Sequence, residues 1–164
     1  MLTLLKPDMM KKPLLSSVML FVSLISFSQT RPALEYYMPA GVTFDTNIPP
    51  PGSFGHEVGE WHVTHDKLYG YMKLLDGLSG RAVWEDYGRS WEGRPLGQLI
   101  ITSEKNMARL EEIRLEHLKL SDPAVARSVN TAEMPLIIKL GYGVHGNESS
   151  AQNASLLTAY YLVA

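Results

Sequence analysis

The sequence predicts an α/β fold, namely part of a mixed β-sheet with helices on both faces. Segments with strand-like apolar patterns alternate with segments in which apolar residues recur every three or four positions. After a first helix the predicted order is strand, strand, helix, strand, helix, which is typical of layered α/β architecture. Three strands are few for such a sheet, so we expect the sheet to be incomplete in this chain.

The composition is that of an ordinary globular protein. The chain has 164 residues, 45% of them hydrophobic and 20% charged, and its net charge is −2. This length suits one domain or part of a larger one. No block of lysine and arginine suited to a phosphate backbone is present, so we expect no nucleic-acid partner. Because cysteine is absent, disulfides, thiol catalysis and cysteine-type zinc sites are excluded.

Residues 1–28 have the layout of a secretory signal peptide. Lys11 and Lys12 form a positive start, residues 14–27 are mostly apolar, and Ser28 closes a small-residue cleavage pattern. The apolar stretch is shorter than the roughly 20 residues of a transmembrane helix, so we expect no membrane anchor after cleavage. The alternative is a buried N-terminal helix. The favoured interpretation is a secreted or periplasmic protein.

The rest of the chain divides into a lead-in and a folded part. Residues 29–60 are rich in proline and glycine, which predicts an extended segment wrapped over a surface. Residues 61–164 carry the predicted elements. The first is a helix over 65–76, with Thr64 as N-cap and Leu68, Tyr71 and Leu75 on one face.

Two short strands follow, over 82–87 and 96–102. The segment 88–95 between them has the glycine, serine and proline of a turn, so the pair is predicted to form an antiparallel hairpin. We expect Glu92 and Arg94 to brace this turn rather than to contact substrate. We expect the side chains of Trp61, Trp84 and Trp91 to pack in the core or on the hairpin.

The second half of the chain predicts a helix, a strand and a final helix. Ser103 can cap a helix over 104–119. The apolar run 136–140 predicts a strand buried on both faces, although Lys139 interrupts it. The last helix is expected to run from about Glu148 to Ala164. It ends without a capping signal, as a helix cut short would.

The candidate site follows the third predicted strand directly. His145 and Glu148 are three residues apart, which places both side chains on one side of a turn. Imidazole nitrogen and carboxylate oxygen are good ligands for zinc. Gly143 and Gly146 let the backbone bend there, and ligands of α/β sheets lie outside the carboxyl ends of strands. An H-x-x-E pattern also occurs by chance, with a surface histidine beside a capping glutamate as the alternative.

Two separated motifs give the chain a family resemblance. The Y-G-R-S-W-E-G-R-P-L stretch at 87–96 precedes an apolar strand, and L-G-Y-G-V-H-G-N-E-S-S follows at 140–150. In this order they resemble the N-terminal part of zinc carboxypeptidases of the carboxypeptidase A-like family, in its secreted bacterial branch. The resemblance covers about residues 40–164. It implies that 61–164 are the N-terminal portion of a truncated catalytic domain, with a zinc-peptidase-like sandwich fold.

The resemblance also implies a chemistry. His145 and Glu148 would be two of three protein ligands to one Zn²⁺ ion, with a water in the fourth position. The metal-activated water would hydrolyse the C-terminal bond of peptide or protein substrates. Asn147 lies where some family members place a substrate-contacting side chain. In the family the third ligand, a general-base glutamate and a carboxylate-binding arginine lie downstream of the H-x-x-E. We therefore expect an N-terminal fragment without catalytic residues of its own, inactive alone.

Two other functions stay open. Metal-dependent hydrolases that remove an acyl group from small N-acyl amino acids share the H-G-N-E pattern, although the predicted signal peptide and the hairpin turn argue against them. A non-catalytic secreted module that binds peptides is the second alternative. Asn147 and Asn153 each begin an N-x-S pattern for glycosylation, which we interpret as chance matches, since a glycan on Asn147 would block the metal site.

Overall fold

The computed structural model describes residues 32–164, which belong to two compact units divided between Tyr37 and Met38. The predicted signal peptide, residues 1–28, lies outside the described residues. The described part of the first unit is one helical turn, α2 (Leu34–Tyr37). Its two tyrosine rings meet edge to face, with their centroids 5.2 Å apart.

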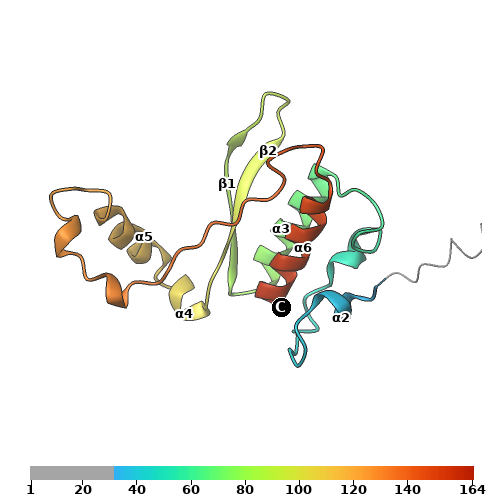
Figure 1. Cartoon of the computed structure of the whole chain (residues 1–164), viewed down its shortest axis with the longest axis horizontal. Coiled ribbons are helices and arrows are strands. Elements are labelled where there is room, and N and C mark those ends of the chain that lie inside the picture. The colour runs from blue at the N-terminus through green and yellow to red at the C-terminus, as the bar shows by residue number, and fades with distance from the viewer. Residues whose placement is uncertain (1–31) are drawn as a thin grey trace, which may run out of the picture. The chain divides into compact units, whose positions relative to one another are not determined.

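The second unit is built from short helices and one hairpin (Figure 1). In chain order its elements are η1 (Pro51–Phe54), α3 (His65–Leu78), β1 (Ala82–Arg89), β2 (Pro95–Ile101), α4 (Glu104–Met107), α5 (Leu110–Lys119), η2 (Ala126–Ser128), η3 (Thr131–Glu133) and α6 (Ser150–Val163). The first predicted helix is confirmed and ends two residues later than expected. The last one begins at Ser150, so Glu148 lies in the preceding loop.

The predicted antiparallel hairpin is confirmed. β1 and β2 pair with Ala82 opposite Ile101, and a bulge between Asp86 and Gly88 shifts the register. At the turn, Arg94 Nε lies 2.9 Å from a carboxylate oxygen of Glu92, which confirms that these two side chains brace the hairpin.

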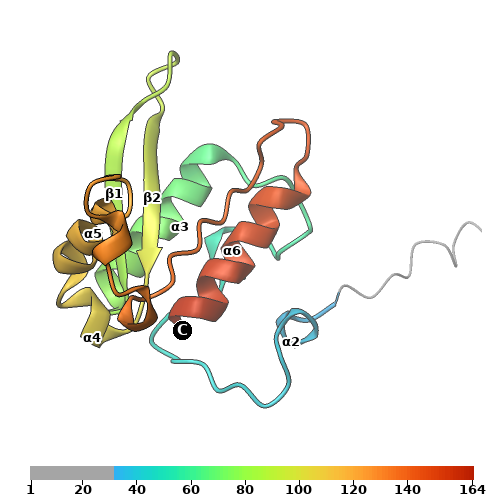
Figure 2. The same ribbon diagram turned by 60° about the vertical axis from the view of Figure 1, so that its left-hand side comes forward.

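The core lies between α3 and α6, which run side by side next to the hairpin (Figures 1 and 2). Tyr71 and Leu75 of α3 are fully buried, as the helical spacing predicted. The other buried apolar residues come from the lead-in, the loop before α3, β1 and α6: Ile48, Val63, Ala82, Leu156, Ala159, Tyr160 and Val163; Ile113 is buried within α5. Because α3 contacts both the hairpin and α6, it is the central element of this unit.

Residues 38–60 of the lead-in pack on this core; the predicted extended lead-in of 29–60 contains two helical turns, α2 in the first unit and η1 in the second. The ring of Phe44 stacks on Tyr160 of α6, with the centroids 5.2 Å apart. The backbone N–H of Asp45 donates to the carbonyl oxygen of Ala164 at 2.8 Å. The Tyr71 hydroxyl donates to the carbonyl oxygen of Pro49 at 3.1 Å. The lead-in is therefore part of the folded unit.

The helix predicted over 104–119 is divided into α4 and α5, so that prediction was wrong about continuity. The Ser103 cap is confirmed, since its hydroxyl accepts from the backbone N–H of Asn106. At Arg109 the backbone turns to φ −125°, outside the helical region, and α5 begins at the next residue. Neither glycine nor proline stands at this break, so composition does not signal it.

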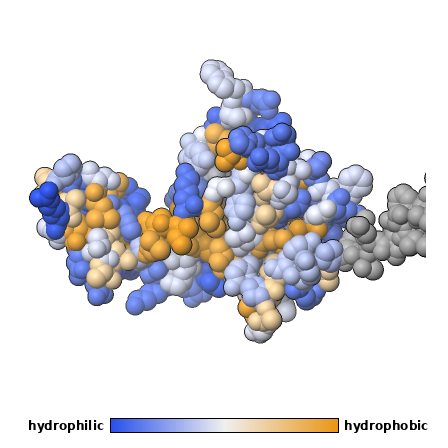
Figure 3. Space-filling model, viewed as in Figure 1, coloured by the Kyte–Doolittle hydropathy of each residue, from blue (hydrophilic) through white to orange (hydrophobic). Residues whose placement is uncertain are grey.

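The predicted buried strand over 136–140 is not formed in the described part of the chain. This segment is extended, yet it pairs with no strand, and Leu136, Ile137, Ile138 and Leu140 are between 56% and 84% exposed. Lys139 is exposed as well, so its charge lies in solvent. Figure 3 shows apolar surface in the part of the view that this segment crosses in Figure 1. The segment has the apolar pattern of a strand, but a strand needs a hydrogen-bonding partner, and none of the described residues supplies one.

The described fold is thus mixed, with helices and a two-stranded antiparallel sheet. α3 covers one face of the hairpin. The expected second layer of helices, on the other face of a larger sheet, is not seen within residues 32–164. None of the described helices has the length and apolar character needed to span a bilayer.

Candidate metal site

His145 and Glu148 meet in the loop that leads into α6. Nδ1 of His145 lies 3.1 Å from a carboxylate oxygen of Glu148, and the N–H of Glu148 donates to the carbonyl oxygen of His145 at 3.1 Å. The two side chains are 70% and 59% exposed. The spacing of three therefore brings them together as predicted, in a tight turn rather than on a helix.

The separation of the two donor atoms fits a shared metal ion. Zinc bonds of about 2.0–2.1 Å at tetrahedral angles place neighbouring donor atoms roughly 3.3 Å apart. The observed 3.1 Å is within a few tenths of an ångström of that spacing. The same 3.1 Å is an ordinary hydrogen-bond length between the two side chains.

Asn147 lies within the same turn and is exposed. It stands between His145 and Glu148 in the sequence.

The loop that carries the pair is held against α6. The Tyr142 hydroxyl donates to Oγ1 of Thr158 at 2.8 Å. Gly143 has a φ of +67°, and a side chain there would meet the Gln152 amide at 2.9 Å. With its amide nitrogen turned toward them, Gln152 donates to the carbonyl oxygens of Glu148 and Ser149 at 3.2 and 2.9 Å. Glycine at 143 is therefore favoured by its backbone angle, whereas the contact with the flexible end of Gln152 is a lesser constraint.

Asn153 is a residue that the sequence analysis missed. Its side chain is 8% exposed, and its Oδ1 accepts from the N–H of Gly59 at 2.9 Å while its Nδ2 donates to the carbonyl oxygen of Trp61 at 3.1 Å. The signal was available, since Asn153 lies on the same helical face as Leu156 and Tyr160. A polar residue on an apolar face predicts a buried hydrogen bond.

No third acidic or histidine side chain joins the pair within residues 32–164. Three other histidines each contact a backbone carbonyl oxygen: His56 that of Glu57, His65 that of Pro95 and His117 that of Pro135. The contacts of His65 and His117 join each ring to a different segment, whereas that of His56 is local and exposed.

A polar cluster on the outer side of α3 and β1 is the other group of titratable side chains. Trp84 Nε1 donates to Asp86 at 2.8 Å, and this bond is the main reason that the pKa of Asp86 lies below its usual value. The Tyr69 hydroxyl donates to the same carboxylate, and Lys73 Nζ lies 3.5 Å from it. The contact with the Tyr69 hydroxyl is the largest cause of a raised pKa for Lys73. Lys73 and Asp86 are exposed, Tyr69 and Trp84 are half-buried, and the four groups satisfy one another, so we interpret the cluster as a brace between helix and hairpin.

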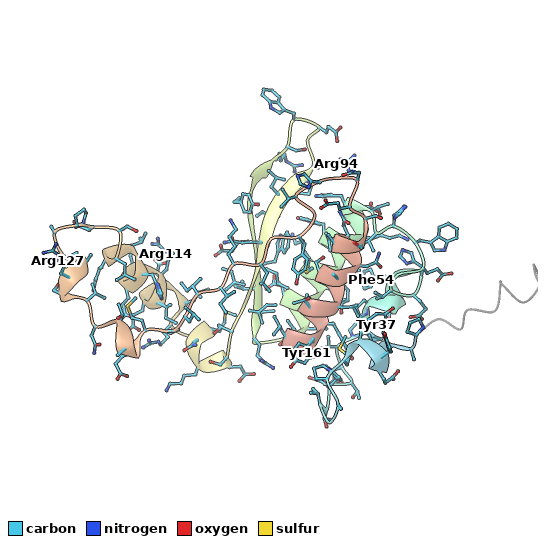
Figure 4. All side chains as sticks on the ribbon, in the orientation of Figure 1. Tyr37, Phe54, Arg94, Arg114, Arg127 and Tyr161 are labelled. Atoms are coloured by element: carbon cyan, nitrogen blue, oxygen red, sulfur yellow. The ribbon has the colours of Figure 1, made fainter. Side chains whose placement is uncertain are left out.

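The tryptophan predictions are partly wrong. Trp84 packs edge to face on Tyr69, with the ring centroids 5.2 Å apart, as expected of hairpin packing. Trp61 is 67% exposed, and Trp91, at the hairpin turn, is fully exposed. In the lead-in, the ring of Phe54 (labelled in Figure 4) packs edge to face on Tyr71, with the centroids 5.2 Å apart.

Two hollows of the described surface lie away from the candidate pair. An open groove of about 670 Å³ lies between α4–α5 and the following loop, with polar residues such as Lys105 and Glu116 on its walls. A second hollow, beside Asn153 and Leu156, has room for about 10 Å³. Neither includes His145, Asn147 or Glu148, so the pair lies on an open surface of this part of the chain.

Comparison of the chain with protein-family models, with curated proteins and with solved structures finds no match.

Proposed function

We propose that this chain is the N-terminal part of a secreted, zinc-dependent carboxypeptidase that hydrolyses C-terminal peptide bonds. The observation that carries the proposal is the contact of 3.1 Å between His145 Nδ1 and the Glu148 carboxylate, in a turn that α6 holds in place. The resemblance of the 87–96 and 140–150 motifs to carboxypeptidase A-like enzymes supports it.

In this proposal His145 and Glu148 supply two of three protein ligands to one Zn²⁺ ion. Held by these residues, a zinc ion would supply Lewis-acid chemistry for amide hydrolysis near neutral pH. The exposed amide of Asn147 contacts the peptide. The third histidine ligand, the general base and the arginine that binds the substrate carboxylate follow later in the complete enzyme. The chain of 164 residues alone is then inactive.

The first test is metal binding by the full chain. Zn²⁺ is titrated against a chromophoric competitor at neutral pH, with His145→Ala and Glu148→Gln as variants and His62→Ala as the matched control for an exposed histidine. We expect both site variants to weaken binding by about tenfold or more, and the control to bind as the wild type does. Equal affinity in all four proteins would contradict the assignment of the pair.

The second test decides among the possible functions. The transcript is read past codon 164, and any longer protein is assayed on peptides with free C-termini and on N-acyl amino acids. Release of C-terminal residues supports the carboxypeptidase, and preference for N-acyl amino acids supports the small-molecule deacylase instead. A stop codon at 165, together with peptide binding by the purified chain, supports the non-catalytic module.

A further inference from the structure

Asn153 is a buried polar side chain of α6, on the face that also carries Leu156, Tyr160 and Val163. Its amide makes two hydrogen bonds to the end of the lead-in and the residue that follows it, across 94 residues to Gly59 and 92 to Trp61. Burying an amide is unfavourable unless such bonds are formed. The bonds therefore specify where the first turn of α6 lies against the lead-in.

The part of the lead-in that receives Asn153 is a tight, internally bonded turn. The N–H of Glu60 donates to the carbonyl oxygen of Glu57, and the Glu60 carboxylate accepts from the N–H of Glu57 at 3.1 Å. Gly59 has a φ of +82°, a backbone conformation that favours glycine. The turn thus presents the Gly59 N–H in one fixed direction.

On its other side the first turn of α6 is continuous with the candidate metal turn. The N–H of Ala151 donates to the carbonyl oxygen of Glu148 at 3.2 Å, and Gln152 contacts the same loop. Asn153 follows directly. An unbroken series of bonded groups therefore joins the lead-in turn, Asn153, the start of α6 and the pair His145–Glu148.

We propose that Asn153 is a positioning residue for the metal site, which fixes the turn of His145 and Glu148 by locking the start of α6 onto the lead-in turn at Gly59 and Trp61. It does not touch the metal or the substrate. This inference rests on the proposed function for its metal-binding part only, because the ordering of the turn can be measured in the metal-free protein.

The test compares two variants that each remove lead-in hydrogen bonds. Asn153→Leu keeps the branched shape and the number of heavy atoms of the side chain, and it removes both hydrogen bonds to Gly59 and Trp61. Tyr71→Phe is the matched control, because it removes the bond from α3 to Pro49 of the same lead-in. In the full chain we expect Asn153→Leu to weaken Zn²⁺ affinity by about tenfold, as loss of a group that orients ligands does, and Tyr71→Phe to leave it within about twofold.

Amide hydrogen exchange in the metal-free chain provides the independent measurement. We expect Asn153→Leu to speed exchange at Glu148 and Ala151, whose N–H groups are bonded in the turn, and Tyr71→Phe to leave those amides unchanged. Gly59→Ala perturbs the same contact from the lead-in side, and we expect it to speed exchange at the same amides. Adding it to Asn153→Leu is then expected to cause little further change, because both variants break one interaction.

The outcomes separate the positioning role of Asn153 from the proposed metal site itself. The positioning role is overturned if Asn153→Leu leaves amide exchange in the turn unchanged. It is also overturned if the wild-type chain binds zinc and Asn153→Leu binds it with the same affinity. Failure of the wild-type chain to bind zinc overturns the proposed metal site, and the exchange data then decide whether Asn153 orders the turn. An equal effect of Tyr71→Phe on the turn would show general loosening and also overturn the specific role.

Discussion

Tyr71 donates a hydrogen bond to the carbonyl oxygen of Pro49 at 3.1 Å, and so ties the middle of α3 to a lead-in segment 22 residues earlier. The ring is fully buried between Phe54 and the α6 side of the core. Together with the contacts of Phe44, Asp45 and Gly59 to α6, it makes a stretch of prolines with no strand of its own a fixed part of the fold.

Removing this hydroxyl is expected to destabilise the chain. Tyr71→Phe leaves the Pro49 carbonyl oxygen without its partner in the core, which typically costs about 1–3 kcal/mol. Chemical unfolding monitored by tryptophan fluorescence measures the change. Tyr36→Phe, on a 77% exposed ring outside the second unit, is the control and should unfold as the wild type does.

Alkaline pH should unfold the chain partly through the same residue. Burial, with a smaller contribution from Tyr160, raises the pKa of Tyr71 above the usual 10.0. Between pH 10 and the native pKa the unfolded chain loses a proton that the native chain keeps, so the free energy of unfolding falls as pH rises. We expect a shallower fall in Tyr71→Phe, measured by urea unfolding between pH 9 and 11. Equal slopes in both proteins would show that Tyr71 titrates normally.

The exposed run 136–140 should make the chain self-associate. Apolar segments of this kind with free backbone groups favour pairing between molecules. Sedimentation velocity over a range of concentrations is expected to show association in the wild type and less of it in Leu136→Ser with Ile138→Ser. Leu118→Ser removes an exposed leucine of α5 and serves as the control. A wild-type chain that is monomeric at all concentrations contradicts this prediction.

The two glycosylation patterns should behave differently in a eukaryotic secretory host. Asn147 is exposed in its turn, whereas both amide atoms of Asn153 are bonded to the lead-in. Any glycan on the folded chain is therefore expected at Asn147, and Asn147→Gln should remove the mass shift that glycosidase treatment reveals. A shift that Asn153→Gln alone removes would refute this assignment.

The sequence predicted the elements whose cause is local. The spacing of Tyr71 and Leu75 predicted α3, and the turn residues between 88 and 95 predicted the hairpin. The contact of His145 with Glu148 also followed from spacing, because three residues suffice to close a turn. In each case the interacting groups lie close together in the sequence.

The predictions that failed depend on distant partners. Residues 136–140 have the pattern of a buried strand, but whether a strand forms depends on a neighbour that sequence pattern does not specify. The break at Arg109 has no glycine or proline to mark it. The hydrogen bonds of Asn153 join residues more than 90 positions apart, and sequence spacing predicts only contacts between residues that are close in the chain.

The lead-in contacts also bear on the order in which the chain folds. Phe44 and Asp45 find their partners at Tyr160 and Ala164, near the end of the described chain. During synthesis the lead-in leaves the ribosome early and stays without these partners until α6 has emerged. Bringing the lead-in and α6 together closes a long loop, and the chain entropy is lost before the contacts between them form. Such non-local topology slows folding. The hairpin and α3 are close neighbours in sequence and can associate first, so docking of α6 and the lead-in is expected to be the late, slow step.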